Sequence, residues 1–185
     1  MNRAKKARVT SMATALREAL TSDTCDMFSI DYDESNVHKW TVNMPSCTFL
    51  ADNEALFKDL EAWAHEHGKP ASVVMEVIFP TDYPRGPPFA RIVRPRFVQR
   101  TGHVTDGGSL CTELLTQEGW TPSIGGAALL LSLHQILNDG EGRVNRFVEY
   151  DYSFAEARQA FERVARDHGW TVRGASATAS SGVGQ

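Results

Sequence analysis

The chain has 185 residues, 42% of them hydrophobic and 23% charged, a balance typical of one globular domain with a packed core. Its formal net charge of −4 gives no indication of general nucleic-acid binding, and no apolar run approaches the roughly 20 residues of a membrane-spanning helix. The three cysteines lack CxxC spacing. They therefore argue against a disulfide framework or a zinc site and favour the cytosol or the nucleus.

Residues 3–21 predict an amphipathic helix, because apolar side chains recur there at helical spacing. These are Val9, Met12, Ala13, Leu16 and Leu20. The first 17 residues also carry five basic side chains and no acidic one. Such a patch indicates an acidic protein surface as a partner, although a solvated helix face explains it equally well.

Residues 26–32 and 37–44 alternate apolar and polar side chains and predict an antiparallel hairpin. Residues 53–66 predict a second amphipathic helix, which Asp52 or Asn53 caps and Gly68 ends, with Leu56, Leu60 and Trp63 as its apolar stripe. Residues 72–79 and 89–94 predict two further strands. The intervening FPTDYPRGPP is too rich in proline for regular structure.

Residues 97–120 show no clear period and predict a long ordered loop, a feature that is usually functional. Residues 124–138 are apolar nearly all round and predict a buried helix. Residues 153–168 predict an amphipathic helix capped by Ser153, and the low-complexity residues 173–185 predict a disordered tail. The order of elements predicts an α+β fold, in which helices surround a small antiparallel meander.

Cys111 is the candidate nucleophile of the loop. It follows GGSL, where glycines let backbone approach a reactant and amide groups face it. Free cysteine is more often a small buried hydrophobe, and we expect that of Cys25 and Cys47. A Cys/His protease is one alternative, but none of the histidines, including His103 and His168, lies in a protease signature.

The run from Val73 to Val144 resembles the core of a ubiquitin-conjugating enzyme. Three motifs carry the resemblance, in the family's order and spacing. They are the strand–loop–strand stretch VVMEVIFPTDYPRGPPFARIVRPRF, the segment GGSLCTELLTQEGW with Cys111 at the active-site position, and the loop from Trp120 through Pro122 to Ser123. A lone YPxxPP would not be specific, but several ordered motifs are.

Within this family the chain is most similar to class Q. The features that carry the similarity are LREAL…DMFSIDY…HKWTVNM at the start, CTELLT after the glycines, and DYSFAEARQAFERVARDHGW near the end. The predicted helix at 53–66 stands where ordinary members have a short turn between strands two and three. The resemblance covers residues 10–172 and implies one domain over residues 1–172. Its implied fold is UBC-like, a four-stranded antiparallel meander flanked by helices, with the extra helix between strands 2 and 3.

The resemblance implies an activity. Cys111 accepts ubiquitin, or a ubiquitin-like protein, from the activating enzyme as a thioester. It then passes the acyl group to an amine, to a hydroxyl or to a ligase cysteine. ATP is used by the activating enzyme, so no metal or organic cofactor is implied here. The implied partners are ubiquitin, the activating enzyme and a ligase, without nucleic acid or membrane.

Two further site residues follow from the family's motifs. Most members place an Asn eight residues before the Cys, and here His103 stands there, either to donate to the developing oxyanion or to support the loop. Asp139 lies where other members orient the incoming lysine, although an Asn-Asp-Gly turn that merely ends the helix is the alternative.

Two partner surfaces are implied by position. Arg85 stands where many members present a Phe to ligases, and with Pro122 and Ser123 it forms the expected ligase-facing edge. The basic first helix is expected to bind the activating enzyme through Arg3, Lys5, Lys6 and Arg8. A non-catalytic UBC-fold scaffold is the alternative function. Such variants lack the active cysteine, which this chain keeps within GGSLC.

Overall fold

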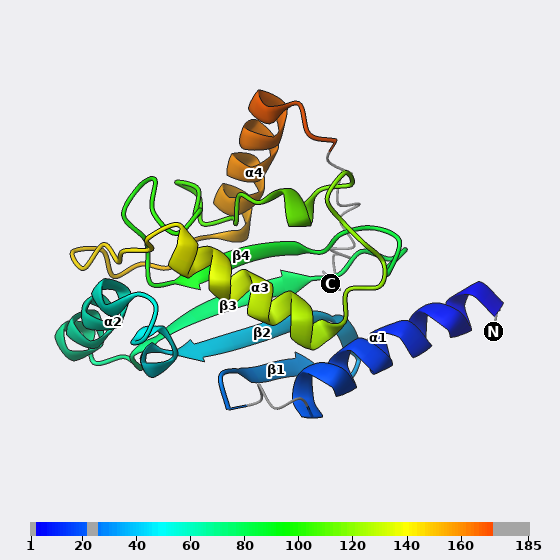
Figure 1. Cartoon of the computed structure of the whole chain (residues 1–185), viewed down its shortest axis with the longest axis horizontal. Helices are drawn as coiled ribbons and strands as arrows, with labels where there is room; N and C mark the ends of the chain where they lie inside the picture. The colour runs from blue at the N-terminus through cyan, green and yellow to red at the C-terminus, as the bar shows by residue number, and fades with distance from the viewer. Residues whose placement is uncertain (1–2, 22–25, 172–185) are drawn as a thin grey trace, which may run out of the picture.

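The structure, a computed structural model, describes residues 3–21 and 26–171. The predicted tail 173–185 and Cys25 therefore lie outside the described residues. Four strands form one antiparallel sheet in the order β1-β2-β3-β4, as the sequence predicts. They are β1 (Ser29–Asp33), β2 (Asn36–Pro45), β3 (Ser72–Ile78) and β4 (Phe89–Arg94). Figure 1 shows this meander with helices around it.

Helix α3 (Gly126–Asp139) lies across one face of the sheet (Figure 1), and α1 (Arg3–Thr21) packs against its N-terminal end. Gly126 permits this close approach, since a Cβ at that position would clash with the carbonyl oxygen of Ala15 and lie 3.1 Å from Trp40. The main core fills the space between these helices and the sheet. Its largest fully buried side chains include Trp40, Trp63 and Phe49.

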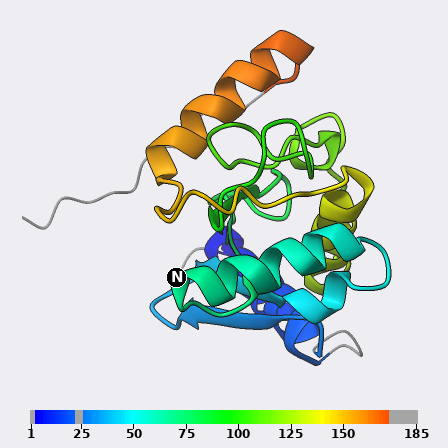
Figure 2. The same cartoon turned by 90° about the vertical axis from the view of Figure 1, so that its left-hand side faces the viewer.

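Helix α2 (Glu54–His67) connects β2 to β3 after a short 3₁₀ helix, η1 (Ser46–Phe49). The predicted cap is Asn53, whose side chain accepts the Leu56 N–H at 2.9 Å, and Gly68 ends the helix in the left-handed conformation. The predicted stripe of Leu56, Leu60 and Trp63 is buried. The helix lies at one end of the sheet (Figures 1 and 2).

Helix α4 (Phe154–His168) packs on the opposite face of the sheet from α3. Its Ala157 and Phe161 form a small second cluster with Phe89, against which Ile78 packs. Ser153 caps the helix, as predicted, and it also forms a capping box with Glu156. Figure 2 shows α4 standing apart from the other helices.

Several sequence predictions were wrong in detail. The first strand begins at Ser29 rather than at residue 26, because residues 26 and 27 form a turn. On α1 the buried stripe is Met12, Ala15, Leu16 and Ala19, whereas Ala13 is exposed and Leu20 is 43% exposed. The side chain of Val9 lies outside the described part. The small alanines at 15 and 19 made the true stripe inconspicuous.

Helix α3 is less buried than predicted. Leu131 on its surface is 37% exposed, and Ala128, Gln135 and Asp139 share the exposed face. An exposed alanine or leucine has the same hydropathy as a buried one, so hydropathy alone did not distinguish the two faces of the helix.

Candidate active site

The loop at 97–120 has order from short backbone pairings and one 3₁₀ helix, η2 (Glu113–Leu115). Leu110 is fully buried, and its N–H donates to the carbonyl of Ala90 on β4 at 3.1 Å. Val104 pairs with Leu110 in an isolated bridge. The next N–H, that of Cys111, donates to the carbonyl of His103 at 2.8 Å. These hydrogen bonds therefore fix the position of Cys111 relative to both β4 and the 99–106 segment.

An open pocket of about 700 Å³ lies beside Cys111. Three stretches of chain besides Cys111 itself form its walls: the 99–106 segment, the end of α3 with the two residues after it, and the C-terminal part of α4. The charged and histidine side chains that line the pocket are Arg100, His103, Asp106, Asp139, Glu141 and His168. Cys111, His103 and Asp139, predicted separately from the sequence, thus line one pocket.

The Cys111 thiol is half-buried. Burial raises its pKa above the ordinary value, because it disfavours the thiolate. The protonated thiol is therefore its resting form at neutral pH. Cys47 differs: it is exposed on η1, so its predicted burial was wrong.

His103 is exposed and has φ of 52°, a left-handed conformation that side chains rarely adopt. The preceding Gly102 donates its N–H to the carbonyl of Gly140 at 2.6 Å. Gly140 is packed so closely that a Cβ there would lie 2.6 Å from the backbone nitrogen of His103. This contact brings the end of α3 to the 99–106 segment.

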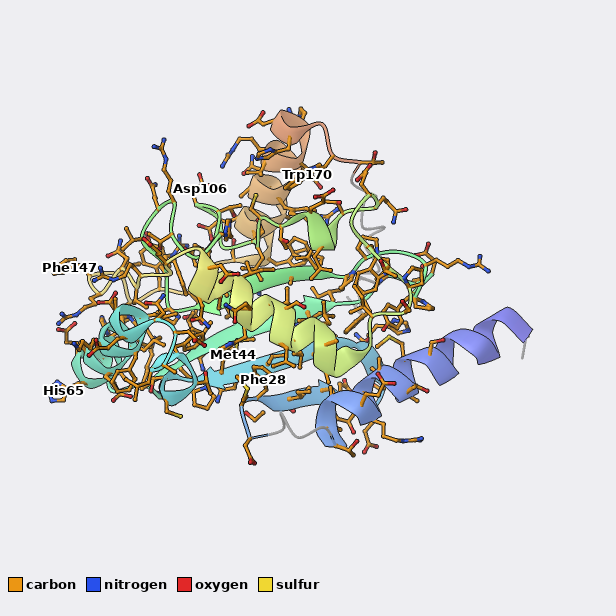
Figure 3. All side chains as sticks on the ribbon, viewed as in Figure 1. Phe28, Met44, His65, Asp106, Phe147 and Trp170 are labelled. Atoms are coloured by element: carbon orange, nitrogen blue, oxygen red, sulfur yellow. The ribbon has the colours of Figure 1, made fainter. Side chains whose placement is uncertain are left out.

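Asp139 is the last residue of α3 and accepts a hydrogen bond from Gln135 at 2.7 Å. It both ends the helix and lines the Cys111 pocket, so the structural and functional interpretations of this residue are compatible. Asp106, on the opposite segment, forms an ion pair with Arg163 of α4 at 2.5 Å. Figure 3 shows Asp106 near the outer surface beside α4.

A Cys/His pair of the protease type needs the ring within hydrogen-bond reach of the sulfur. His103 and His168 both line the pocket. In the part of the chain that the structure describes, however, neither ring is hydrogen-bonded to the Cys111 sulfur. The His168 ring instead stacks on Trp170, with centroids 4.6 Å apart.

The expected ligase edge lies outside the pocket. Arg85, Pro122 and Ser123 are exposed, and none of them lines the pocket beside Cys111. Their two loops are joined by Trp120, whose indole N–H donates to the carbonyl of Pro84 at 2.7 Å. These three residues therefore belong to adjoining loops.

The four basic residues of the expected activating-enzyme surface lie on the N-terminal half of α1, which extends beyond the sheet (Figure 1). Their backbone is helical, and their side chains lie outside the described part. Across residues 3–21 and 26–171, no group of three or more potential ligands is placed to hold a metal ion. No helix in these ranges has the length and hydropathy to cross a membrane.

Sequence reasoning did not assign several lining residues to the site. Glu141 and Val164 carry no local motif, and His168 was considered only as a protease histidine; these residues reach the pocket through tertiary folding. The GGSLC context indicates the cysteine, but nothing in the order of residues places the end of α4 beside it. Arg100 and Asp106 lie within the predicted functional loop, and that proximity was the available signal.

Comparisons with known proteins agree with this architecture. The family model described as ubiquitin-conjugating enzyme matches residues 71–168. Ubiquitin-conjugating enzyme E2 25 of Caenorhabditis elegans is 28% identical over 142 residues, which are 74% of this chain and 35% of that protein. The ubiquitin-conjugating enzyme E2 Q-like protein 1 of Mus musculus is 28% identical over 150 residues, 78% of this chain and 87% of that protein.

The chain thus spans about a third of the length of the worm relative and most of that of the mouse relative. A crystal structure of a ubiquitin conjugating enzyme E2 from Plasmodium falciparum has the same fold, with a TM-score of 0.53 at 20% identity over 75% of this chain and 87% of that one. The family match covers more than half of the chain and includes Cys111. The chain therefore belongs to the ubiquitin-conjugating enzyme family, in which it is class Q-like.

Proposed function

We propose that this chain accepts ubiquitin, or a ubiquitin-like protein, as a thioester on Cys111 and transfers it to an acceptor. The observation that carries the proposal is the position of the half-buried Cys111 thiol beside an open pocket of about 700 Å³, within a chain of this family. The pocket leaves room for an acyl group and an incoming acceptor next to the sulfur.

The proposed loading step is a transthiolation. The Cys111 thiolate attacks the carbonyl carbon of the thioester that the activating enzyme carries; the new C–S bond forms, and the old one breaks. The departing thiolate of the activating enzyme takes up the proton that Cys111 has lost. One thioester replaces another, so this step needs no ATP, and it needs no cofactor on this chain.

In the discharge step an acceptor amine or hydroxyl attacks the carbonyl carbon, and the Cys111 sulfur leaves as a thiolate. The acceptor's proton passes to a base. We propose that Asp139 either is this base or orients the acceptor. The N–H of Cys111 is already donated to the His103 carbonyl. A donor for the oxyanion must therefore come from elsewhere, and the exposed His103 ring that lines the pocket is our candidate.

The direct test uses ubiquitin, an activating enzyme and ATP, followed by electrophoresis with and without reductant. Wild-type protein should form an adduct that reductant removes. Cys111→Ala should form none, and Cys111→Ser should form at most an oxygen ester that resists reductant. Cys47→Ser is the matched control, because Cys47 is a free cysteine on the exposed surface; this variant should load like wild type.

An adduct that survives in Cys111→Ala would refute the proposal, and so would the absence of an adduct in wild type with ubiquitin and with each related modifier. Binding of ubiquitin without any adduct would instead support the non-catalytic scaffold. Substitution His103→Ala separates the two roles of that residue. If His103→Ala changes neither loading nor discharge to free lysine, the ring is not the oxyanion donor.

On the ligase side, we propose that the exposed Arg85, Pro122 and Ser123 form the contact edge, and that the basic half of α1 binds the activating enzyme. Arg85 gives this edge a positive charge, which favours a ligase with an acidic surface. Binding to candidate ligases should therefore weaken with added salt and with Arg85→Glu.

A further inference from the structure

Helix α2 contacts one particular segment, residues 140–149, which we call the post-α3 segment. The two lie side by side at one end of the sheet (Figures 1 and 2). Contacts occur along the whole of α2 and just beyond both of its ends. Five side chains of this stretch bind the post-α3 segment: Asn53, Asp59, Trp63, Glu66 and Lys69. Helix α2 and the residues next to it therefore hold the post-α3 segment in place.

Asp59 makes the most extensive of these contacts. Its side chain is only 10% exposed. It accepts from the Arg143 Nε at 2.6 Å and from Nη2 at 3.1 Å, a two-point interaction with one guanidinium. It also accepts the backbone N–H of Val144 at 3.1 Å. One carboxylate thus fixes both a side chain and the backbone of the post-α3 segment, by hydrogen bonds of the strong, charge-assisted kind.

The post-α3 segment in turn binds residues 96–102, which lead into the Cys111 pocket. The N–H of Val98 donates to the Arg143 carbonyl at 2.8 Å. The hydroxyl of Thr101 accepts the Arg143 N–H at 3.1 Å. The N–H of Gly102 donates to the Gly140 carbonyl at 2.6 Å. Arg143, which Asp59 holds, is therefore hydrogen-bonded on both its N–H and its carbonyl to this part of the loop.

The network reaches the pocket directly, because Gly140, whose carbonyl accepts the Gly102 N–H, is itself a lining residue. Gly102 precedes His103, whose carbonyl accepts the Cys111 N–H. Asp139 and Glu141, on either side of Gly140, line the pocket from the other wall. Asp59 itself does not line the pocket, so its influence on the chemistry runs through the backbone of the post-α3 segment.

We propose that Asp59 is a positioning residue for the Cys111 pocket: by binding Arg143 and the Val144 N–H, it sets the distance between the Asp139–Glu141 wall and Cys111. The inference rests on the proposed function and deepens it. Loading requires access to the sulfur, whereas discharge requires an acceptor held beside the thioester. Displacement of this wall therefore slows discharge more than loading, since small errors in the position of a reacting group cost large factors in rate.

The experiment compares Asp59→Ala, Asp59→Asn and wild type in the full chain. Loading is measured as the rate of reductant-sensitive adduct formation, and discharge as the loss of the isolated adduct on adding free lysine. We expect Asp59→Ala to slow discharge about 10-fold with loading within about 2-fold of wild type. Asp59→Asn keeps one oxygen acceptor for the Val144 N–H and should lie between the two.

Glu66→Gln is the matched control. Glu66 lies on the same helix and pairs with Arg146 of the same segment, but both side chains are about 40% exposed and neither bonds to residues 96–102. This variant should load and discharge like wild type. Amide hydrogen exchange provides a second readout: exchange at Val98 and Gly102 should accelerate in Asp59→Ala and not in Glu66→Gln.

The outcomes are distinguishable. An adduct in wild type whose discharge is unchanged by Asp59→Ala and Asp59→Asn overturns this inference and leaves the proposed function standing. Equal losses of loading and discharge, in proportion to lost thermal stability, also overturn it. A wild-type chain that forms no adduct overturns both the proposed function and the inference. If Asp59→Ala fails to fold, Asp59→Asn alone decides between these results.

Discussion

Substituting Gly140 by Ala tests whether the end of α3 and the 99–106 segment are held in register. Gly140 has φ of −82°, which alanine adopts without strain, so the effect arises from space alone. The added Cβ would lie 2.6 Å from the His103 nitrogen, 2.7 Å from His103 Cδ2 and 2.8 Å from the Gly102 carbonyl carbon. The backbone atoms must retreat by about 0.8 Å to reach ordinary van der Waals contact at 3.4 Å.

Overpacking of this kind costs about 1–3 kcal/mol, and the retreat widens the pocket between Asp139 and His103. We expect a lower melting temperature together with slower discharge of the Cys111 thioester. Gly68→Ala is the control, because Gly68 has φ of +62° and no atom within 4 Å of an added Cβ. Its left-handed backbone costs about 1 kcal/mol without touching the site.

Thermal unfolding and single-turnover discharge on both variants give the comparison. The two should lose similar stability, but only Gly140→Ala should lose discharge. If both variants discharge at the wild-type rate, or if both are slowed alike, the contact between Gly140 and His103 does not control the chemistry and the reasoning is refuted.

Three further predictions concern α2, the thiol and α4. Asn53→Asp keeps the helix cap but replaces the side-chain donor to the Gly142 carbonyl, a hydrogen bond of 3.1 Å, with a carboxylate. We expect denaturant unfolding to show a loss of about 1–3 kcal/mol in stability. We also expect the variant to slow discharge more than loading. Because burial raises the pKa of Cys111, alkylation of its thiol at neutral pH should be slower than that of a short cysteine peptide. The alkylation rate of Cys111 should also keep rising above pH 9.0. Peptide mass spectrometry would measure both rates, and equal rates would contradict the burial. The hydrogen bond from Arg96 lowers the pKa of Glu156 from 4.5 to about 2, so its carboxylate stabilises the fold above pH 4.5 and loses this effect as the pH falls toward about 2. Glu156→Gln should therefore lower stability at neutral pH by about 1 kcal/mol for a side chain 44% exposed, and the difference should narrow in acid.

The strands and helices were predictable where side chains of one kind recur at a fixed period. Leu56, Leu60 and Trp63 mark the buried face of α2, because the apolar stripe of an amphipathic helix faces the core. The stripe of α1 was misplaced by contrast, because it contains the small residues Ala15 and Ala19, both buried. The backbone of Ala15 lies against α3 at Gly126, where small residues allow close approach. Period alone does not report such a role.

The candidate site was predictable in its residue types and not in its construction. Cys111 and Asp139 were proposed from their positions in the family pattern, and His103 from the place where most members carry an Asn; all three line one pocket. The network that places them depends on partners far apart in sequence: Asp59 and Arg143 are 84 residues apart. An acidic residue on a predicted helix and an arginine in a predicted loop both look like solvated surface, and only the fold shows that Asp59 is buried against Arg143.

The raised pKa of Cys111 and the network from α2 bear on the same step. An environment that disfavours the thiolate makes the sulfur a poorer leaving group, just as it makes it a slower nucleophile. A thioester formed there would be correspondingly long-lived in the absence of an acceptor. Its discharge would then depend on how well the pocket walls hold the attacking group, which is the property that Asp59 and Gly140 set through the post-α3 segment. Relaxing those walls should therefore slow discharge more here than in a site where the thiolate leaves readily.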